Sequence, residues 1–215
     1  MKLSTDQRLL DAAVEHFGRL GLSGASTRAI ARDAGAPMSA ITYHFGGKEG
    51  LYLAAARHIG ETLRGRLAPA VAEAESALAG GGRASARRAL HAVYAHMVGV
   101  LNAPETAPLA RFIVREQADP TEAFSTIYET LMAPLLTRVA ALLAIVGAGQ
   151  LGDGEARLRT MALFGQALVF RVARETALRG LGWTDIGADE QSSIRRVIGA
   201  HLDATLDALE QGSGP

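Results

Sequence analysis

The sequence of 215 residues predicts an all-α fold, in which a small N-terminal three-helix domain precedes a larger helical domain. Two observations support this prediction. Ala, Leu, Arg and Glu, which favour helices, are abundant, whereas runs of β-branched residues are few. Apolar residues recur at intervals of three and four along most of the chain, as they do on the buried face of a helix. Glycine and proline then divide the chain into separate helices.

The first predicted helix covers residues 5–20 and follows Ser4–Gln7, which has the spacing of a capping box. Gly21 and Gly24 end this helix. Its apolar residues form one stripe, which consists of Leu9, Ala13, Phe17 and Leu20.

Two short helices follow, at residues 27–34 and 38–45. Ser26 is the expected N-cap of the first, and Gly35 ends it. A tight turn at Ala36-Pro37 leads into the second, which ends at Gly46-Gly47. A long fourth helix begins near Lys48 and ends before the glycines at 80–82, with Pro69 as an expected kink.

The rest of the chain is predicted to be helical as well. Asp119-Pro120 is expected to start a helix, because an N-cap acid precedes a proline at the first helical position. Pro108 and Pro134 lie within apolar helical patterns and are expected to bend them. We expect the tail, Gly212–Pro215, to fray. The remaining predicted helices cover residues 84–102, 105–118, 120–147, 153–180 and 189–210.

Composition excludes several classes of protein. The chain has no cysteine, which rules out disulfides, thiolate catalysis and cysteine-based zinc sites. The polar stretch Ser4–Arg8 interrupts any apolar signal segment, and the longest charge-free apolar run, Val139–Gly152, is too short to span a bilayer. We therefore expect a soluble, cytoplasmic protein with no membrane partner.

Charge is distributed unevenly, although the formal net charge is zero. Residues 1–66 contain nine Lys or Arg and six Asp or Glu, whereas the remaining residues contain thirteen and sixteen. A modestly basic N-terminal region permits binding to a phosphate-rich partner.

The second and third predicted helices have the outline of a helix-turn-helix, whose second member enters the major groove of DNA. One set of residues forms their packing face: Ile30, Ala31, Ala34, Ile41 and Phe45. A second set is expected to face outward from the third helix: Met38, Ser39, Ala40, Thr42, Tyr43 and His44.

The stretch "STRAIARDAGAPMSAITYHFGGKEGLY" resembles the N-terminal signature of the TetR family of transcriptional regulators. The resemblance covers residues 5 to about 60. Two positions depart from the family pattern: Gly47 stands where Ser, Asn or Asp is usual, and Thr42 where a second aromatic residue is common. The matching residues are Thr27, Ile30, Ala31, Ala34, Gly35, Tyr43, His44, Phe45, Lys48, Glu49 and Leu51.

This resemblance implies roles in DNA binding that agree with the chemistry of the side chains. Tyr43, His44 and Lys48 are expected to hold phosphate, the last at the exposed N-terminus of a helix. Thr27 adds a hydroxyl contact, and Arg28 is the expected guanine-binding side chain. The expected base-reading residues of the third helix are Met38, Ser39, Ala40 and Thr42.

The C-terminal part is similar to the CecR-like subgroup of the same family, in the stretches "ARFIVREQADPTEAFSTIYETLMAPLLTRV", "LVFRVARETALRGLGWT" and "VIGAHLDATLDAL". The resemblance implies a homodimeric repressor that a small-molecule inducer releases from an inverted repeat in double-stranded DNA. A DNA-binding domain at residues 1–47 would precede a ligand-sensing and dimerisation domain at 48–211, with dimerisation through residues 153–210. The ligand-binding candidates are Phe112, Glu116, Phe164 and Arg171.

Two other functions remain open at this point. The helical domains could bind a small molecule without binding DNA. Alternatively, "GAGQLG" at 147–152 matches a dinucleotide-binding GxGxxG, which would require a preceding strand and would make the protein an oxidoreductase. The regulator interpretation implies no enzymatic activity and no cofactor. Metal binding is not expected either, because His91 and His96 lie five residues apart and His201 has no evident partner.

Overall fold

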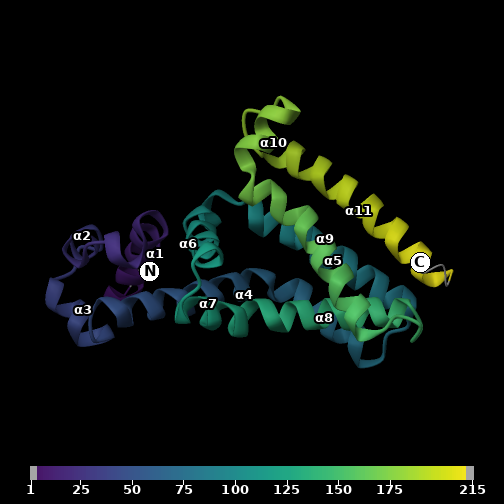
Figure 1. Ribbon diagram of the computed structural model, residues 1–215, viewed down its shortest axis with the longest axis horizontal. Coiled ribbons are helices and arrows are strands. Elements are labelled where there is room, and N and C mark those ends of the chain that lie inside the picture. Colours follow the sequence, from purple (N-terminus) through teal and green to yellow (C-terminus); the bar gives the residue numbers. More distant parts are fainter. Residues whose placement is uncertain (1–3, 212–215) are drawn as a thin grey trace. The chain divides into compact units, whose positions relative to one another are not determined.

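The computed structural model describes residues 4–211, so the prediction for the Gly212–Pro215 tail lies outside the described residues. Every regular element in this range is helical, which confirms the all-α prediction (Figure 1). The α-helices are α1 (Thr5–Gly24), α2 (Thr27–Asp33), α3 (Met38–Phe45), α4 (Lys48–Gly80), α5 (Arg83–Asn102), α6 (Ala107–Ala118), α7 (Glu122–Ile127), α8 (Ala133–Val146), α9 (Asp153–Val172), α10 (Arg174–Leu181) and α11 (Ala188–Glu210), with a 3-10 turn at Pro104–Thr106 and a π turn at Tyr128–Met132.

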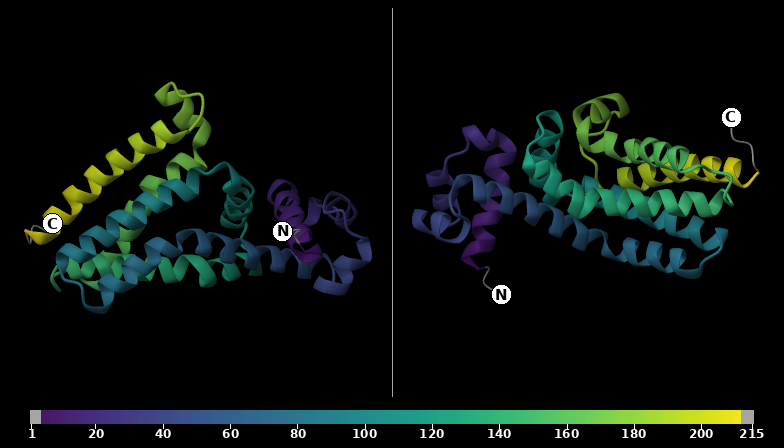
Figure 2. Two further views of the ribbon diagram at one scale, coloured as in Figure 1. Left: turned by 180° about the vertical axis from the view of Figure 1, so that it is seen from behind. Right: turned by 60° about the horizontal axis from the view of Figure 1, so that its bottom comes forward.

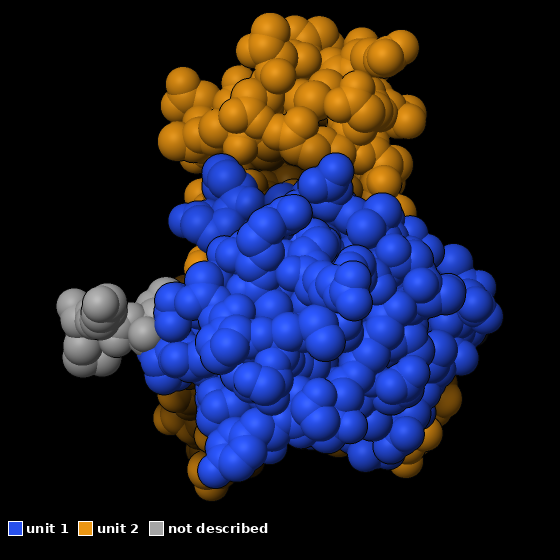
Figure 3. All heavy atoms as spheres, turned by 90° about the vertical axis from the view of Figure 1, so that its left-hand side faces the viewer, with its two compact units in different colours: residues 1–64, 104–132 blue, residues 65–103, 133–215 orange. Residues whose placement is uncertain are grey.

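The chain forms two compact units (Figure 3). Unit 1 contains Met1–Arg64 and Pro104–Met132, and unit 2 contains Gly65–Ala103 and Ala133–Pro215. Helix α4 is continuous between them and contains Pro69 within its length. Unit 1 therefore joins the predicted helix-turn-helix region to α6 and α7, which lie more than fifty residues later in the sequence.

Unit 1 is organised around α1, which lies against α2 and α6, while α2 lies against α3. Three residues of the apolar stripe predicted for α1, Leu9, Ala13 and Phe17, form much of the core, since they have no exposed surface. The prediction was wrong for Leu20, which is 50% exposed. Ile30 of α2 and Ile41 of α3 are buried beside this core at 0% and 2% exposure. Burial of these side chains holds the short α2 and α3 in place, because helices of this length have little stability alone.

Unit 2 is a helical layer around α5, which lies against α8, α9 and α11 (Figures 1 and 2). Helix α9 also lies beside α8, and α10 returns beside α9. Its core is apolar and includes Leu90, Val98, Leu142, Leu143 and Leu202, all without exposed surface.

Two predicted helix boundaries were wrong. The predicted helix at 153–180 is broken at Ala173, where φ −104° and ψ 37° separate α9 from α10. Alanine is the best helix former, so this break has no local sequence signal and must come from packing. The helix predicted to start at residue 120 begins at Glu122, and its N-cap is Thr121, whose hydroxyl accepts from the Ala123 N–H. Asp119, the predicted N-cap, lies at the C-terminal end of α6.

The two prolines flagged in the sequence behave differently. Pro108 lies in the first turn of α6, where its missing N–H costs nothing, so the predicted bend there was wrong. Pro134 is the second residue of α8 and lies two residues after the π turn Tyr128–Met132. Because proline cannot donate to the carbonyl four residues earlier, the helical hydrogen-bond ladder is altered at this point, and the bend predicted at Pro134 stays a prediction.

One segment is long and apolar enough to cross a membrane by composition alone. It covers Glu122–Val146, with a mean hydropathy of 1.7 in its most apolar window. Within unit 2, however, the α8 part of this segment packs on α5 and α9 and buries Leu135, Val139 and Leu142. Helix α8 therefore packs one apolar face on the core of unit 2, whereas only 28% of the most apolar part of the whole segment is buried.

The stretch "GAGQLG" at 147–152 is a loop between α8 and α9, with Ala148 and Gly149 at φ 50° and 77°. The element before it is a helix rather than a strand. The dinucleotide-binding alternative was therefore wrong, because the phosphate-binding turn of that motif depends on a βαβ unit.

Candidate nucleic-acid interface

The turn between α2 and α3 is built by local sequence signals. The Ser26 hydroxyl accepts from the Ala29 N–H at the start of α2, as predicted for an N-cap. At its end, the N–H of Gly35 donates to the Arg32 carbonyl and the N–H of Ala36 to the Ala31 carbonyl, at 3.0 and 2.9 Å. Pro37 then starts α3. This sharp reversal sets the two helices in the helix-turn-helix arrangement.

The outward face of α3 is polar and aromatic. Tyr43 is 85% exposed and Met38 is 51% exposed. Ser39 and Thr42 are also exposed. Ala40 is different: it is only 8% exposed and belongs to the core, so the prediction that it faces outward was wrong. On a short helix its small side chain gave no sequence signal of which face it occupies.

His44 is held by the N-terminal end of α1. Its Nδ1 lies 3.2 Å from Asp6 Oδ1, and its ring meets the Tyr43 ring edge-on with centroids 4.9 Å apart. The sequence-based assignment of His44 as a phosphate contact did not include this acidic partner. The pair links α1 to the helix that carries the exposed tyrosine.

Lys48 lies at the first position of α4, beside two glycines that the backbone requires. Gly47, which stands where the family pattern has Ser, Asn or Asp, has φ 129°, which side-chain-bearing residues rarely adopt. A Cβ on Gly50 would lie 1.8 Å from the Phe45 carbonyl oxygen, so α3 and α4 approach too closely for any side chain. The Lys48 ammonium donates to the Ser23 carbonyl at 3.1 Å.

The remaining DNA-binding candidates lie on α2. Arg28 is exposed and Thr27 is half-buried at the start of the helix. The N-terminal end of α2, the outward face of α3 and the N-terminal end of α4 are consecutive in the chain. This order is consistent with a surface on which hydroxyls and cations surround a groove-reading helix.

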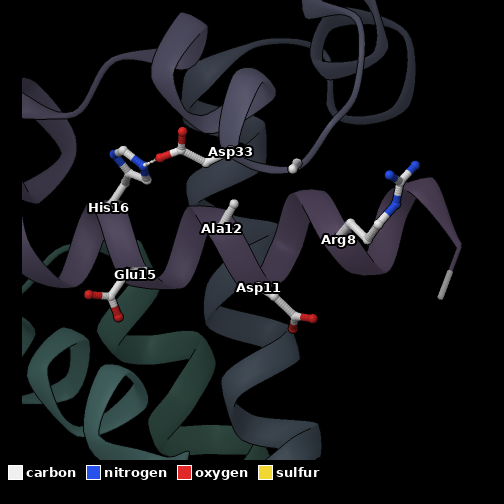
Figure 4. Close-up of a pocket in the computed structure, with 7 residues that line it drawn as sticks. Arg8, Asp11, Ala12, Glu15, His16 and Asp33 are labelled. Atoms are coloured by element: carbon white, nitrogen blue, oxygen red, sulfur yellow. Dashed lines mark hydrogen bonds and ion pairs between the residues drawn. The ribbon is translucent and has the colours of Figure 1, made fainter.

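A surface hollow of about 290 Å³ lies between α1 and α2, lined by Arg8, Asp11, Ala12, Glu15, His16, Asp33 and Ala34 (Figure 4). His16 Nε2 lies 2.8 Å from Asp33 Oδ2, and Arg32 donates to the other oxygen at 2.9 Å. The His16 hydrogen bond, followed by that of Arg32, holds the pKa of Asp33 below its usual value. The His16–Asp33 pair joins α1 to α2, and Arg8 of α1 adds a hydrogen bond to the Gly35 carbonyl.

The four predicted ligand-binding residues divide between the two units. Phe112 and Glu116 belong to unit 1 and are 0% and 1% exposed. Glu116 accepts hydrogen bonds from Tyr52 and Thr121, so its oxygens already have protein partners. Phe164 and Arg171 lie on α9 in unit 2, where both are half-buried.

An exposed apolar stripe runs along α9. Its apolar side chains are Leu158 at 65%, Met161 at 53%, Val169 at 47% and Val172 at 53% exposure. Gly165 lies on the same face, and a Cβ there would meet nothing within 4 Å. Helix α11 adds Val197, which is 42% exposed. Leu202 and Leu206 of α11, in contrast, have no exposed surface and face the core of unit 2.

A braced helix-turn-helix with an exposed second helix defines a DNA-binding protein of the helix-turn-helix class. The chain belongs to the TetR family of bacterial transcriptional regulators. Residues 9–55 match the model for bacterial regulatory proteins of the tetR family, and residues 86–209 match the model for the C-terminal domain of the HTH-type transcriptional dual regulator CecR. Members of this family are regulators rather than enzymes.

Curated and solved relatives agree with this assignment. The chain is 35% identical to the HTH-type transcriptional dual regulator CecR of Shigella flexneri over 96% of this chain and 93% of that protein. AibR, solved with isovaleryl coenzyme A and operator DNA, matches with a TM-score of 0.66, 14% identity and coverage of 92% and 97% of the two chains. FadR of Bacillus subtilis, solved with stearoyl-CoA, matches at 0.58, with 17% identity and coverage of 96% and 98%. At these identities the solved structures support the fold.

Proposed function

We propose that this regulator represses transcription by binding an inverted-repeat operator as a homodimer, and that a small-molecule inducer releases it. The observation that carries the proposal is the outward face of α3, where the Tyr43 side chain is 85% exposed. A tyrosine so exposed adds little to the core and is available to a partner. The division into a DNA-binding domain at 1–47 and a sensing domain at 48–211 is part of this proposal.

Contacts to DNA divide into two chemical groups. Tyr43 and Lys48 supply a hydroxyl and an ammonium at adjacent helix ends, which suits phosphate oxygens. His44, whose ring contacts Tyr43, orients that hydroxyl or adds a phosphate contact. Arg28 suits a guanine edge. Thr27, Met38, Ser39 and Thr42 complete the surface with hydroxyl and methyl groups that favour thymine methyls and DNA shape.

Dimerisation is assigned to the exposed stripe of α9 and to Val197 of α11. The α9 residues repeat at intervals of three, four and seven, which is the pattern of a helix packed along a partner helix. A two-fold symmetric dimer would present two copies of α3, and half-sites about one helical turn apart would accept both.

The inducer is a small molecule that binds the helical body. Acyl-coenzyme A thioesters are bound by two of the solved relatives, AibR and FadR, and are therefore the first compounds to test. Phe164 and Arg171 on α9 remain the candidate contacts in unit 2, because an apolar ring and a cation suit an acyl chain and an anionic group.

Fluorescence anisotropy tests the DNA-binding assignment, with an inverted-repeat duplex selected by the wild-type protein from a random pool and a scrambled duplex. Lys48→Ala should weaken binding to both duplexes and flatten the log–log salt dependence by about one unit for each subunit. Lys48→Arg, which keeps the charge, is the matched control. Loss of affinity for the selected duplex alone, with the full salt slope retained, would contradict the phosphate assignment.

A further inference from the structure

A buried polar network joins three helices of unit 1 at Glu116. Its side chain is 1% exposed, and that of Tyr52 on α4 is 3% exposed. The Tyr52 hydroxyl donates to Glu116 Oε1 at 2.5 Å. Oε2 accepts from the N–H and the hydroxyl of Thr121, at 3.1 and 2.9 Å. Three donors therefore meet two oxygens, a pattern that suits an acceptor-only carboxylate.

Aromatic rings enclose the Tyr52 end of this network. Tyr52 meets the ring of Phe17 edge-on at 4.8 Å between centroids and the ring of Phe112 at 4.7 Å with a tilt of 32°. Both phenylalanines have no exposed surface. Burial, followed by the hydrogen bond to Glu116, raises the pKa of Tyr52, so the phenol stays a hydrogen-bond donor across the physiological range.

Further contacts hold α6 along α1. Arg111 pairs with Glu15 at 2.7 Å, and Arg115 donates to the Arg19 carbonyl at 3.1 Å. The backbones are also close, because a Cβ on Gly18 would lie 3.1 Å from the Pro108 carbonyl oxygen. Helix α6 is thus in contact with α1 along its length and hydrogen-bonded to α4 at Glu116.

Thr121 extends the network to the next helix. Its hydroxyl donates to Glu116 and accepts from the Ala123 N–H at 3.2 Å, which caps α7. Glu116 therefore fixes the turn between α6 and α7 as well as the contact with α4. A buried carboxylate with all its donors in place is costly to disturb, since removing one partner leaves a buried polar group without a hydrogen bond.

We propose that Glu116 is a positioning residue for operator binding. The segment Pro104–Met132 of unit 1 would then contribute to DNA binding although it lies outside residues 1–47. Tyr52 lies one helical turn after Lys48 on α4, and Lys48 in turn contacts the end of α1 at Ser23. Through Tyr52, Glu116 constrains α1 and α4, the two helices that hold α2 and α3. This inference rests on the proposed DNA-binding function and reassigns Glu116 from inducer contact to internal anchor.

Variants of the network test the proposal on the full-length protein. Glu116→Gln and Tyr52→Phe keep shape but remove an acceptor or a donor. Each should weaken binding to the selected inverted-repeat duplex by roughly 2- to 30-fold, the range of measured coupling effects of residues outside a binding site. Binding to the scrambled duplex should change less than about twofold, because phosphate attraction does not require a precise arrangement of the two recognition helices. The double variant should lose less than the two single losses combined.

Thr121 is exposed, so we expect the protein to tolerate two substitutions at this position. Thr121→Val removes the hydroxyl and should weaken operator binding, whereas Thr121→Ser keeps it and should bind as the wild type does. Glu122→Gln is the control for loss of an exposed glutamate in the same segment. Circular dichroism at the assay temperature establishes that each variant is folded.

Distinct outcomes separate this inference from the proposed function. Wild-type protein that binds no duplex would reject DNA binding itself. Wild-type binding together with folded Glu116→Gln and Thr121→Val variants of unchanged operator affinity would overturn the positioning role, even if their melting temperatures fall. If Glu116→Gln fails to fold, two other measurements test the positioning role. One compares operator binding by Thr121→Val and Thr121→Ser, and the other measures amide exchange of α6 in the wild type with and without the selected duplex. Added protection of α6 on DNA binding is expected, and none would reject the inference.

Discussion

Tyr43 and Tyr52 are nine residues apart and occupy opposite environments. Tyr43 is 85% exposed at the end of α3, whereas Tyr52 is 3% exposed and donates to Glu116. Both lie near Lys48, so the same short stretch supplies the proposed DNA-binding surface and a buried anchor of the fold. The difference teaches that a polar group left open to solvent can serve recognition, whereas one with all partners inside the protein serves geometry.

Truncation of an aromatic ring should have its largest effect in the buried region. Phe112→Ala should lower the free energy of unfolding by about 3–5 kcal/mol, because it leaves a cavity beside Tyr52. Tyr43→Ala should change stability by no more than about 0.5 kcal/mol, since the ring is solvated. Urea denaturation measures both. A similar loss of stability in the two variants would erase the proposed distinction between surface and anchor.

Charge on the α9 stripe should separate the proposed dimer. Met161→Glu would bury a carboxylate without a partner, at a cost of roughly 3 kcal/mol for each subunit, and should yield monomers by light scattering. Ser76→Glu on α4, where the side chain is also exposed, is the control and should remain dimeric. A dimeric Met161→Glu protein would place the interface away from this stripe. Leu206 is unsuitable for the test, because its substitution would disrupt the core of unit 2.

Arg28 tests whether the exposed surface reads sequence. Arg28→Ala should cost about 1–3 kcal/mol at the selected duplex and relax discrimination at one position in each half-site. Arg32→Ala removes an equal charge from the same helix, but Arg32 is hydrogen-bonded to Asp33, so we expect little loss of discrimination. Competition assays with single-base variants of the duplex compare them. Equal relaxation by both substitutions would mean that α2 contributes only charge.

The smallest expected effect concerns acid stability of the α1–α2 contact. The pKa of Asp33 is lowered in the folded protein, so its pairs contribute stability that is present above its usual value of 3.8 and lost as pH falls through the folded pKa. Asp33→Asn should therefore reduce stability slightly at pH 7 and make the loss of stability below about pH 4 less steep. Urea unfolding at both pH values measures the difference. If Asp33→Asn loses stability below pH 4 as steeply as the wild type does, these exposed pairs are screened by solvent.

Much of the fold could be predicted from the sequence because its signals are local. Ser26 caps α2, Gly46 and Gly47 end α3, and the 3.6-residue periodicity locates most helices within two or three residues. The helix-turn-helix could be identified for the same reason, since its packing and surface residues lie within one short segment. Hydrogen-bonding and steric preferences of this kind act between near neighbours, and the sequence displays them directly.

Contacts between distant segments required the three-dimensional structure. Nothing around Glu116 indicates that Tyr52, sixty-four residues earlier, donates to it. In the same way, the burial of Ala40, Leu202 and Leu206 and the break at Ala173 depend on which helix faces which. An apolar residue on an amphipathic helix is compatible with a core or with an interface, and a glutamate with a ligand or with an anchor. The choice depends on the partners that tertiary packing supplies, because burial and hydrogen-bond satisfaction are properties of the assembled helices.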